Sequence, residues 1–370
     1  MDKTTFSLIH GNAFDVLKKL KDNSFQCCVT SPPYWALREY EVEENQIGRE
    51  PTPQLYIENL VNIFFQIKRI LREDGTLWLN IGDTFCGSGS KKDGGDSYYF
   101  LGRNGQKIAL NQKVHGFKRK DMLGIPWALA KALQKPILKC KSCKYIGHSI
   151  YWGELPNYKY WCPKCKEEKS IEIVENGFYL RSDVIWHKPN PLPHPVADRC
   201  TSAHDYIFLL SKSEKYYYDH YAIMENSEKK GKRNKRDVWT VPLASFSKAH
   251  FAVFPTDLIE PCVLAGTSKK GMCRECKKPY KRIVKKFKSG NYNDYKTIGW
   301  EKGCNCSSKN IQPCTVIDPF NGAGTTGVVA IKNGRNYLGV DINNKYIKMT
   351  RERLNDIDPL FIEEIKWKII

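Results

Sequence analysis

The chain has 370 residues, 41% of them hydrophobic, and a formal net charge of +19. This length suits one large catalytic domain, the apolar fraction excludes a disordered chain, and no apolar run is long enough to predict a membrane helix. The excess of Lys and Arg predicts a polyanionic partner, most often nucleic acid.

The N-terminal residues carry no secretory leader pattern, so we expect a cytoplasmic protein in a reducing compartment. In that compartment, 14 cysteines are more typical of metal ligands or buried thiols than of disulfides.

Basic residues concentrate in three segments, 83–120, 227–237 and 267–290. The third segment holds ten Lys or Arg and one Glu. Such runs are often solvated loops. Because they interrupt an otherwise apolar, patterned chain, we expect them to be insertions that contact phosphates.

Strand and helix signals alternate along the first part of the chain. Residues 25–30 form a short apolar run that stops at two prolines, which predicts a strand followed by a loop. Residues 54–71 carry a helical apolar face, and residues 73–75 are expected to end that helix. Residues 76–81 predict a second buried strand.

The same alternation returns near the C-terminus. Residues 314–317 predict a strand, 321–326 a glycine-rich turn, 326–332 a helix and 337–340 another strand. Strands and helices that alternate at this spacing predict an α/β fold with a mostly parallel sheet.

The glycine-rich segment, Asp318 to Thr326, follows a predicted strand and begins a helix. Glycines let the backbone approach a ligand closely, and a helix N-terminus offers free N–H groups. Asp341 ends the next strand, where an acid can accept hydrogen bonds from ribose hydroxyls. This order predicts a nucleoside cofactor site, since neither phosphate-binding glycine motif is present.

A second segment, Thr30 to Trp35, stands at the carboxyl end of a predicted strand, where α/β proteins place their chemistry. Pro32 and Pro33 fix an extended backbone without N–H donors. A Ser hydroxyl and nearby carbonyls can accept the hydrogens of an amino group, and an aromatic face can stack on a planar ring. The segment therefore suits a ring-bound amine, although these residues also fit an ordinary loop.

Together the two segments resemble the amino-methylating DNA methyltransferases, which use S-adenosylmethionine to methylate cytosine N4 or adenine N6. The resemblance is to the group in which SPPY or DPPY precedes DPFxGxGTT, the β-type motif order. Asn12 departs from the pattern because the family commonly has Asp there, so the charge is lost. Further matches are His10 to Ala13, Gly75 to Asp83, Trp186 to Pro191, Asp198, Arg199, His204 and His250 to Pro255.

The resemblance implies a Rossmann-like methyltransferase sheet that binds S-adenosylmethionine and double-stranded DNA. The catalytic segment is then Ser31, Pro32, Pro33 and Tyr34. Cofactor contacts are expected from Asn12, Phe254, Asp318, Phe320, Gly322, Gly324, Thr325, Thr326 and Asp341, although Phe254 also fits an ordinary core position. DNA contacts are expected from Trp35, Lys188, Arg199, Lys277, Lys278, Lys281 and Arg282.

An exocyclic amine is a poor nucleophile because its lone pair is delocalised into the ring. If the Ser31 hydroxyl and the Pro32 carbonyl accept its hydrogens, the nitrogen can become pyramidal and attack the sulfonium methyl in line. Tyr34 would stack on the extruded base. Methylation at cytosine carbon instead needs a Cys nucleophile. Cys262 and Cys314, which follow prolines, fall in predicted core elements where we expect buried, inert thiols.

The target base stays open between two amines. In the family, Ser before Pro-Pro-Tyr more often accompanies cytosine N4, so Ser31 favours cytosine, with adenine N6 as the alternative. A catalytically inactive, zinc-containing DNA-binding protein and an RNA substrate are further alternatives. The expected setting is a bacterial, archaeal or phage modification enzyme, either orphan or paired with a cognate restriction endonuclease, with no membrane partner.

Two cysteine sets have the spacing of metal ligands. Cys140, Cys143, Cys162 and Cys165 form two Cys-x2-Cys pairs with 18 residues between them, as in a zinc ribbon. Cys273, Cys276, Cys304 and Cys306 have a longer spacer of 27 residues and a tighter second pair. We expect one or two structural zinc ions, against the alternative of free thiols. Each ion would fold an insertion too small to build its own core.

The expected organisation is a single methyltransferase domain over residues 1–370 with three insertions. These are a basic loop at 83–120, a zinc ribbon at 138–170 and a second Cys-rich basic segment at 267–312.

Overall fold

The computed structural model of the protein describes residues 3–35, 46–86, 98–101, 107–110, 117–118, 120–151, 153–155, 159–168, 170–193, 197–227, 231–243, 254–289, 292–357 and 362–367. Among these residues, no helix combines the length and the apolar character that a membrane span requires. Most of the basic loop predicted at 83–120 lies outside the described residues.

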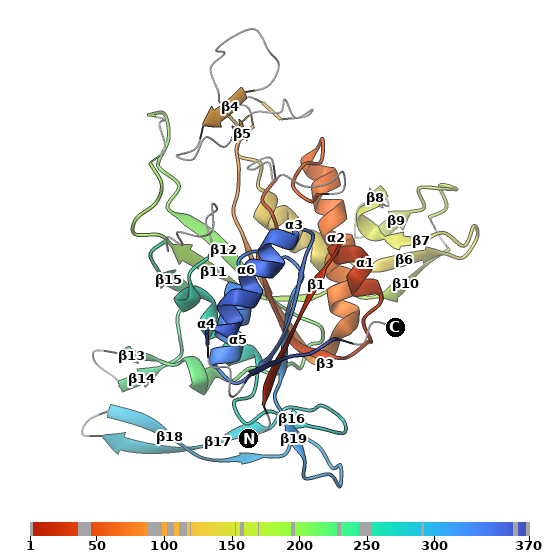
Figure 1. The fold of residues 1–370 in the computed structure, drawn as a ribbon. Coiled ribbons are helices and arrows are strands. Elements are labelled where there is room, and N and C mark those ends of the chain that lie inside the picture. The colour runs from red at the N-terminus through yellow and green to blue at the C-terminus, as the bar shows by residue number, and fades with distance from the viewer. Residues whose placement is uncertain are drawn as a thin grey trace.

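A nine-stranded sheet forms the centre of the protein (Figure 1), in the order β15-β11-β12-β3-β2-β20-β21-β1-β22. Within this sheet, β12 pairs antiparallel with β3 and β11, and the other neighbours pair in parallel. The predicted α/β fold with a mostly parallel sheet is confirmed. In spatial order, the strands are Val238–Thr240, Tyr179–His187, His204–Ser211, Leu71–Ile81, Phe25–Thr30, Thr315–Asp318, Asn336–Asp341, Thr4–His10 and Ile362–Glu364.

Helices cover both faces of the sheet, which makes three layers (Figure 1). Buried residues of α1 (Ala13–Lys18), α2 (Pro53–Ile70) and α3 (Ile125–Gln134) join one core cluster. Those of α4 (Thr256–Gly266), α5 (Thr325–Lys332) and α6 (Asn344–Asn355) join the other. Because both faces are covered, the central strand β2 is buried at all six positions.

The predicted elements agree closely with the observed ones, with one correction. The strand predicted at 25–30 is β2, and the helix predicted at 54–71 is α2. Residues 73–75 were expected to end that helix, but α2 ends at Ile70 and these residues belong to β3. The helix-breaking Gly75 is needed in the strand because a Cβ there would lie 2.9 Å from the Arg72 carbonyl oxygen.

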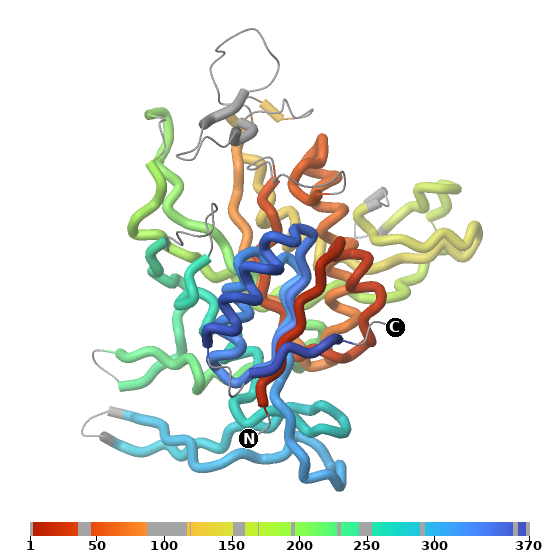
Figure 2. Tube along the Cα trace, viewed as in Figure 1, coloured from red at the N-terminus to blue at the C-terminus, as the bar shows by residue number. Residues whose placement is uncertain are grey.

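Two small insertions extend from the body (Figure 2). The first lies between α3 and β11 and comprises β6 (Ile137–Cys140), β7 (Ile146–His148), β8 (Gly153–Leu155), β9 (Lys159–Trp161) and β10 (Ile171–Glu175). The second comprises β16 (Met272–Cys273), β19 (Ile311–Gln312) and a long ribbon of β17 (Lys281–Ser289) and β18 (Tyr292–Glu301). The ribbon also pairs with β14 (Gly231–Arg233), which pairs with β13 (Glu225–Ser227). A separate pair, β4 (Tyr98–Leu101) and β5 (Lys107–Leu110), belongs to the basic loop.

Candidate active site

The carboxyl ends of the parallel strands bring the predicted catalytic and cofactor segments to one edge of the sheet. The catalytic segment follows β2, and the glycine turn follows the adjacent strand β20. Asp341 ends β21, the next strand, and Lys188 follows β11. In open α/β sheets this edge is where ligands bind.

Residues of the core and of α2 hold the catalytic segment in place. Pro32 is buried, and Ser31 and Pro33 are partly buried. The buried Tyr56 of α2 donates a hydrogen bond from its hydroxyl to the Pro33 carbonyl at 2.8 Å. The Trp35 indole N–H donates to the Glu50 carbonyl at 2.9 Å. The Pro33 carbonyl therefore accepts a hydrogen bond from inside the fold, which ties the segment to α2.

Tyr34 is the centre of a polar network. Its hydroxyl lies 3.2 Å from both the Asn80 Oδ1 and the Asp205 Oδ2, so its one hydrogen is shared between two acceptors. Lys188 donates from Nζ to the same Asp205 oxygen at 2.5 Å. Burial and then the charge of Asp205 raise the pKa of Tyr34 well above its ordinary value, so the phenol stays protonated. The ring lies close over the backbone, because a Cβ on Gly82 would be 2.7 Å from both Tyr34 Cε2 and Asp205 Oδ1.

Asp318 connects the catalytic strand to the glycine turn. The Thr30 hydroxyl donates to its Oδ1 at 2.6 Å, the Thr326 hydroxyl to its Oδ2 at 2.9 Å, and the Phe320 backbone N–H to Oδ1 at 3.0 Å. Asp318 is 1% exposed, and burial raises its pKa to about 6. Because these donors surround the carboxylate, the Asp318 oxygens are used inside the protein. Asp318 therefore holds the end of β2 and the glycine turn in place.

Asp341 holds the glycine turn from the neighbouring strand. Its Oδ2 accepts from the Gly322 backbone N–H at 2.7 Å, and its Oδ1 from the Asn343 backbone N–H at 2.8 Å. Burial raises its pKa to about 6. Gly322 has φ +49°, and a Cβ there would meet only the Phe320 carbonyl, at 3.9 Å. The turn therefore presents bare backbone to open space beside a partly buried carboxylate.

Other predicted cofactor residues have structural roles. Gly324, with φ +75°, packs against Thr350, and Thr325 and Thr326 are buried. Asn12 caps α1, because its Oδ1 accepts from the Phe14 and Asp15 backbone N–H groups. The expectation of direct cofactor contact by the Thr326 side chain is wrong, since the hydroxyl is 0% exposed and donates to Asp318.

Two predicted aromatic cofactor contacts lie in or beside the core. The Phe320 ring meets Phe64 edge to face with centroids 6.3 Å apart. Phe254 packs, partly buried, against the core cluster of α4 and α5. Residues 250–253 of its motif lie outside the described residues.

Neither proline-adjacent cysteine is a nucleophile at this edge. Cys262 and Cys314 are both 0% exposed. Burial raises the pKa of Cys314 to about 11 and raises that of Cys262 well above its ordinary value. The expectation of buried, inert thiols is confirmed.

The two cysteine sets each bring four sulfur atoms together. Within each set, all Sγ atoms lie within 4.8 Å of one another. Backbone N–H groups of Cys143 and Cys276 lower the pKa values of Cys140 and Cys273 to about 7. Three of the four closely spaced Cys pairs have the same turn. In it, the residue after the second Cys has positive φ, and its backbone N–H donates to the carbonyl of the first Cys. These residues are Lys144, Lys166 and Lys277.

The structure corrects two predicted DNA contacts. Trp35 is 3% exposed and belongs to the core, so its ring is not available to DNA. Arg282 bonds through its guanidinium to the buried carboxylate of Asp219, with Nη2 and Oδ2 2.8 Å apart. Leaving Asp219 buried without this cation would be costly, so Arg282 is a structural residue.

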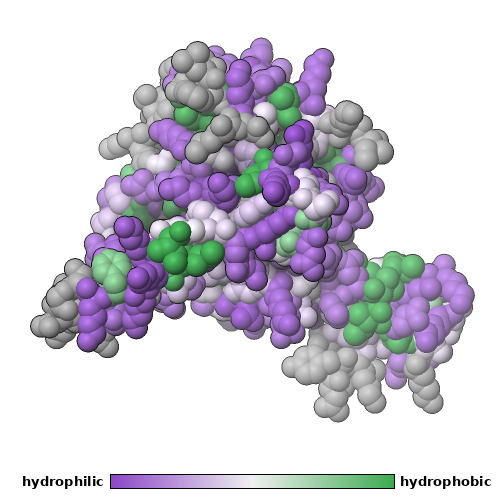
Figure 3. Space-filling view, turned by 90° about the horizontal axis from the view of Figure 1, so that it is seen from below, coloured by the Kyte–Doolittle hydropathy of each residue, from purple (hydrophilic) through white to green (hydrophobic). Residues whose placement is uncertain are grey.

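The predicted contacts Lys277, Lys278 and Lys281 lie at the opposite edge of the sheet. Arg72, at the beginning of β3, donates to the Cys276 carbonyl at 2.8 Å. Its neighbour Leu71 pairs with Phe25 at the start of β2, and the catalytic segment follows Thr30 at the other end of that strand, about 17 Å away at ~3.3 Å per residue. Figure 3 shows this opposite end of the molecule from below as mostly hydrophilic. These lysines are therefore remote from the catalytic segment.

Arg199 and Lys188 lie nearer the catalytic edge. The Arg199 guanidinium lies 3.4 Å from the centroid of Phe85, which follows β3. Lys188 pairs with Asp205, and its ammonium also lies 4.7 Å from the centroid of Trp186. DNA contact by either residue stays a prediction.

The sequence assigned no role to four residues that hold the site: Tyr56, Asn80, Asp205 and Thr30. Thr30 begins the catalytic segment and Asn80 lies within the resembling Gly75 to Asp83 stretch, but their partners lie across the fold and no local pattern shows those contacts. Asp83, at the end of the resembling Gly75 to Asp83 strand, accepts from the Gly124 and Ile125 backbone N–H groups at the beginning of α3. Burial raises its pKa.

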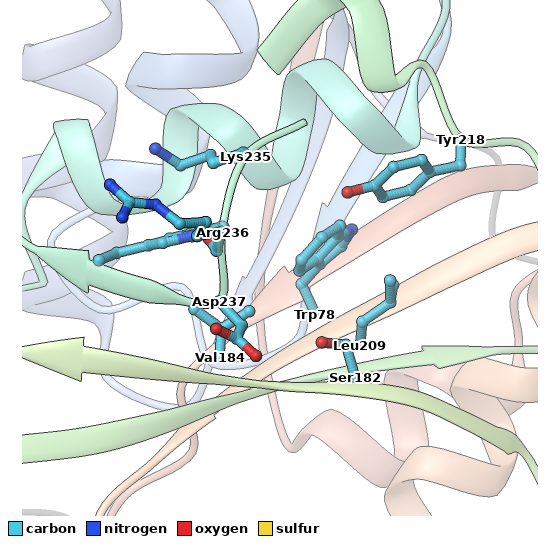
Figure 4. A pocket seen from close by; sticks show the side chains of 9 residues that line it. Trp78, Ser182, Val184, Leu209, Tyr218, Lys235, Arg236 and Asp237 are labelled. Atoms are coloured by element: carbon cyan, nitrogen blue, oxygen red, sulfur yellow. The ribbon is translucent and has the colours of Figure 1, made fainter. Parts of the chain in front are cut away.

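A small pocket lies below this edge, on the α4 side of the sheet (Figure 4). Trp78, Trp239 and Tyr218 form its aromatic wall, and Lys235 and Arg236 line its rim. No predicted site residue lines it, and Trp78 lies in the middle of β3 rather than at its end. The catalytic edge and this pocket are therefore separate features.

Comparisons with known proteins agree with the geometry. The family model described as DNA methylase matches residues 25–352. Type II methyltransferase M.Cfr9I of Citrobacter freundii is 36% identical over 355 residues, which cover 95% of this chain and 88% of that protein. M.SmaI of Serratia marcescens is 34% identical over 351 residues, which cover 94% of this chain and 90% of that protein.

A solved structure has the same fold. The PvuII DNA methyltransferase, described as cytosine-N4-specific, aligns with a TM-score of 0.54 at 15% identity, over 96% of this chain and 91% of that one.

Proposed function

Because the chain belongs to the DNA methylase family of S-adenosylmethionine-dependent amino-methyltransferases, we propose that it methylates N4 of cytosine within a specific DNA sequence. The observation that carries the proposal is the Ser31 to Tyr34 segment, held beside the glycine turn by the bond from Thr30 to Asp318. Ser rather than Asp at position 31 favours cytosine, and adenine N6 is the alternative.

The catalytic segment would act on an extruded base. The Ser31 hydroxyl and the Pro32 carbonyl accept the two amine hydrogens, which lets the nitrogen recover its lone pair. Tyr56 donates to the Pro33 carbonyl, which directs that carbonyl toward α2. The Tyr34 ring, anchored at its hydroxyl, offers a face for stacking.

The glycine turn would hold the cofactor, because Gly322 exposes backbone and Asp341 lies beside it. When bound there, S-adenosylmethionine supplies an electrophilic methyl group. Asp341 is partly buried, and its bond to the Gly322 N–H fixes the turn. The residues present therefore fit a nucleoside cofactor.

Replacing Ser31 by Ala tests the assignment of the catalytic segment. We expect methyl transfer to DNA to fall by about a hundredfold or more, on the scale of one lost transition-state hydrogen-bond partner. Calorimetric titration should show nearly unchanged affinity for S-adenosylmethionine. A variant that loses cofactor affinity instead would show that Ser31 belongs to the cofactor site. A wild-type protein that binds DNA without methylating it would favour the inactive binding protein.

We also propose that each cysteine set holds one structural zinc ion. Four sulfur atoms within 4.8 Å suit the tetrahedral shell of zinc, and backbone N–H groups stabilise the thiolates. Metal analysis should find two zinc ions per chain, and Cys143→Ser should remove one of them. A metal content that is unchanged in that variant would contradict this site.

The relatives M.Cfr9I and M.SmaI are described as Type II methyltransferases. By that similarity, the chain would be the modification partner of a restriction endonuclease. Plasmid DNA from cells that express the chain should resist the endonuclease that cuts at its methylation sequence. Complete cleavage of fully methylated plasmid would contradict a protective role.

A further inference from the structure

We propose that Asp205 and Lys188 position the Tyr34 ring for stacking on the target base. This inference rests on the proposed function, because it assumes that Tyr34 faces an extruded base. The Lys188 ammonium pairs with Asp205, with Nζ and Oδ2 2.5 Å apart.

The network joins three strands that meet at the catalytic edge. Asn80 is near the end of β3, Asp205 near the beginning of β12, and Lys188 directly after β11. Asn80 is itself fixed, because its Nδ2 donates to the Tyr206 carbonyl at 3.0 Å. The hydroxyl of Tyr34 therefore has two acceptors on strands of the central sheet.

Charge balance explains why both Asp205 and Lys188 are needed. The Asp205 side chain is 12% exposed and that of Lys188 is 16% exposed. A carboxylate with so little exposure lowers the stability of the fold unless a cation lies beside it. Lys188 supplies that cation, on the same Asp205 oxygen that Tyr34 contacts. The phenol, whose pKa is raised, remains the donor in the hydrogen bond to Asp205.

The bond matters for stacking because a Tyr ring fixed only at Cβ can still change rotamer. A hydroxyl tied to two strands fixes the ring plane before the base arrives, which lowers the entropic cost of binding. Asp205 and Lys188 are thus positioning residues. They act through the Tyr34 hydroxyl, without touching the base.

A double-mutant cycle tests this role. Tyr34→Phe keeps the ring and removes the hydroxyl, and Asp205→Ala removes its acceptor. We expect each single change to lower kcat by about tenfold or more, as for loss of a hydrogen bond to a charged group, with little change in KM for DNA. Because both changes remove one interaction, Asp205→Ala should cost little more in the Tyr34→Phe background.

Equal losses from Asp205→Ala in both backgrounds would overturn the proposal, and so would wild-type kcat in Tyr34→Phe. If Asp205→Ala does not fold, the paired change Asp205→Leu with Lys188→Met, which leaves no unpaired charge, replaces it in the same cycle with the same expected result. Tyr217→Phe is the matched control, because its hydroxyl contacts the Tyr280 carbonyl at the opposite edge. These kinetics presuppose a wild-type enzyme that methylates DNA, so its inactivity would refute the proposed function instead.

Discussion

Asp318 shows how one carboxylate organises two segments of the site. It was expected to bind the cofactor, yet its oxygens accept from Thr30, Thr326 and the Phe320 backbone. The sequence identified the position because it begins the glycine-rich segment. It could not identify the role, because Thr30 lies 288 residues away along the chain.

The raised pKa of Asp318 gives a pH dependence of stability. Burial raises its pKa from 3.8 to about 6, so folding favours the protonated acid. Its contribution to the free energy of unfolding is therefore fully present below pH 3.8 and is lost as the pH rises through about 6. We expect the stability advantage of wild type over Asp318→Asn to shrink from pH 5 to pH 7.5. Chemical denaturation of both proteins at each pH measures this, and a difference independent of pH would contradict the assignment.

The position of the predicted catalytic segment was the most predictable part of the candidate site. Two prolines after a buried strand fix where Ser31 and Tyr34 must lie. The residues that hold them were not predictable, because Tyr56, Asn80 and Asp205 act through tertiary contacts. Trp35 was misjudged for a related reason: its ring turns into the core, and nothing in the local pattern shows its direction.

Among the elements, α5 links the cofactor turn to the sheet. It begins after Gly324 and is followed by Gly334, and the two glycines have φ +75° and +73°. A Cβ on Gly324 would overlap the Thr350 side chain, whereas one on Gly334 would meet nothing within 4 Å. A substitution at Gly334 therefore adds backbone strain alone, whereas one at Gly324 adds the same strain and a clash with Thr350.

We expect Gly334→Ala to cost only the strain of a left-handed residue, about 1 kcal/mol. Gly324→Ala should cost a further ~1–3 kcal/mol of unfolding free energy, because it also overpacks the core. Urea denaturation of both variants measures the difference. Equal costs at the two positions would show that Thr350 yields to the added methyl group.

The predicted bounds of helices and strands agree with the observed ones where the apolar pattern is clearly that of a helix or of a strand, as in β2 and α2. The prediction failed at Glu73 to Gly75 because turn-forming residues were placed in a strand. There, the residues between Leu71 and Thr76 leave the regular register, since Phe25 pairs with Leu71 and Cys27 with Thr76. The turn-forming residues therefore make an irregularity within β3 rather than an end to it.

On the scale of the whole molecule, positive charge lies at both edges of the sheet. Net charge alone predicted a polyanionic partner but could not assign it to an edge. The fold places Lys277, Lys278 and Lys281 away from the catalytic segment, whereas Lys118 and Lys120 lie in the loop that follows β3. Lys120 also pairs with Asp198, whose neighbour Arg199 lies over Phe85.

This placement changes the expected salt dependence of DNA binding. Replacing Lys118 and Lys120 by Ser should flatten the slope of log affinity against log salt by up to about 0.9 per lost phosphate contact. Replacing Lys277 and Lys278 by Ser is the matched control, and it should leave the slope unchanged. A flatter slope in the control alone would place the duplex against the second insertion instead.

The most direct test of the account is nucleoside mass spectrometry of DNA from cells that express the chain. The account predicts N4-methylcytosine with wild type and none with Ser31→Ala. N6-methyladenine instead would keep the amine mechanism and correct the base. The result that would contradict the account is DNA without a methylated amine, or methylation at cytosine carbon, because the Ser31 to Tyr34 segment would then have no amine to act on.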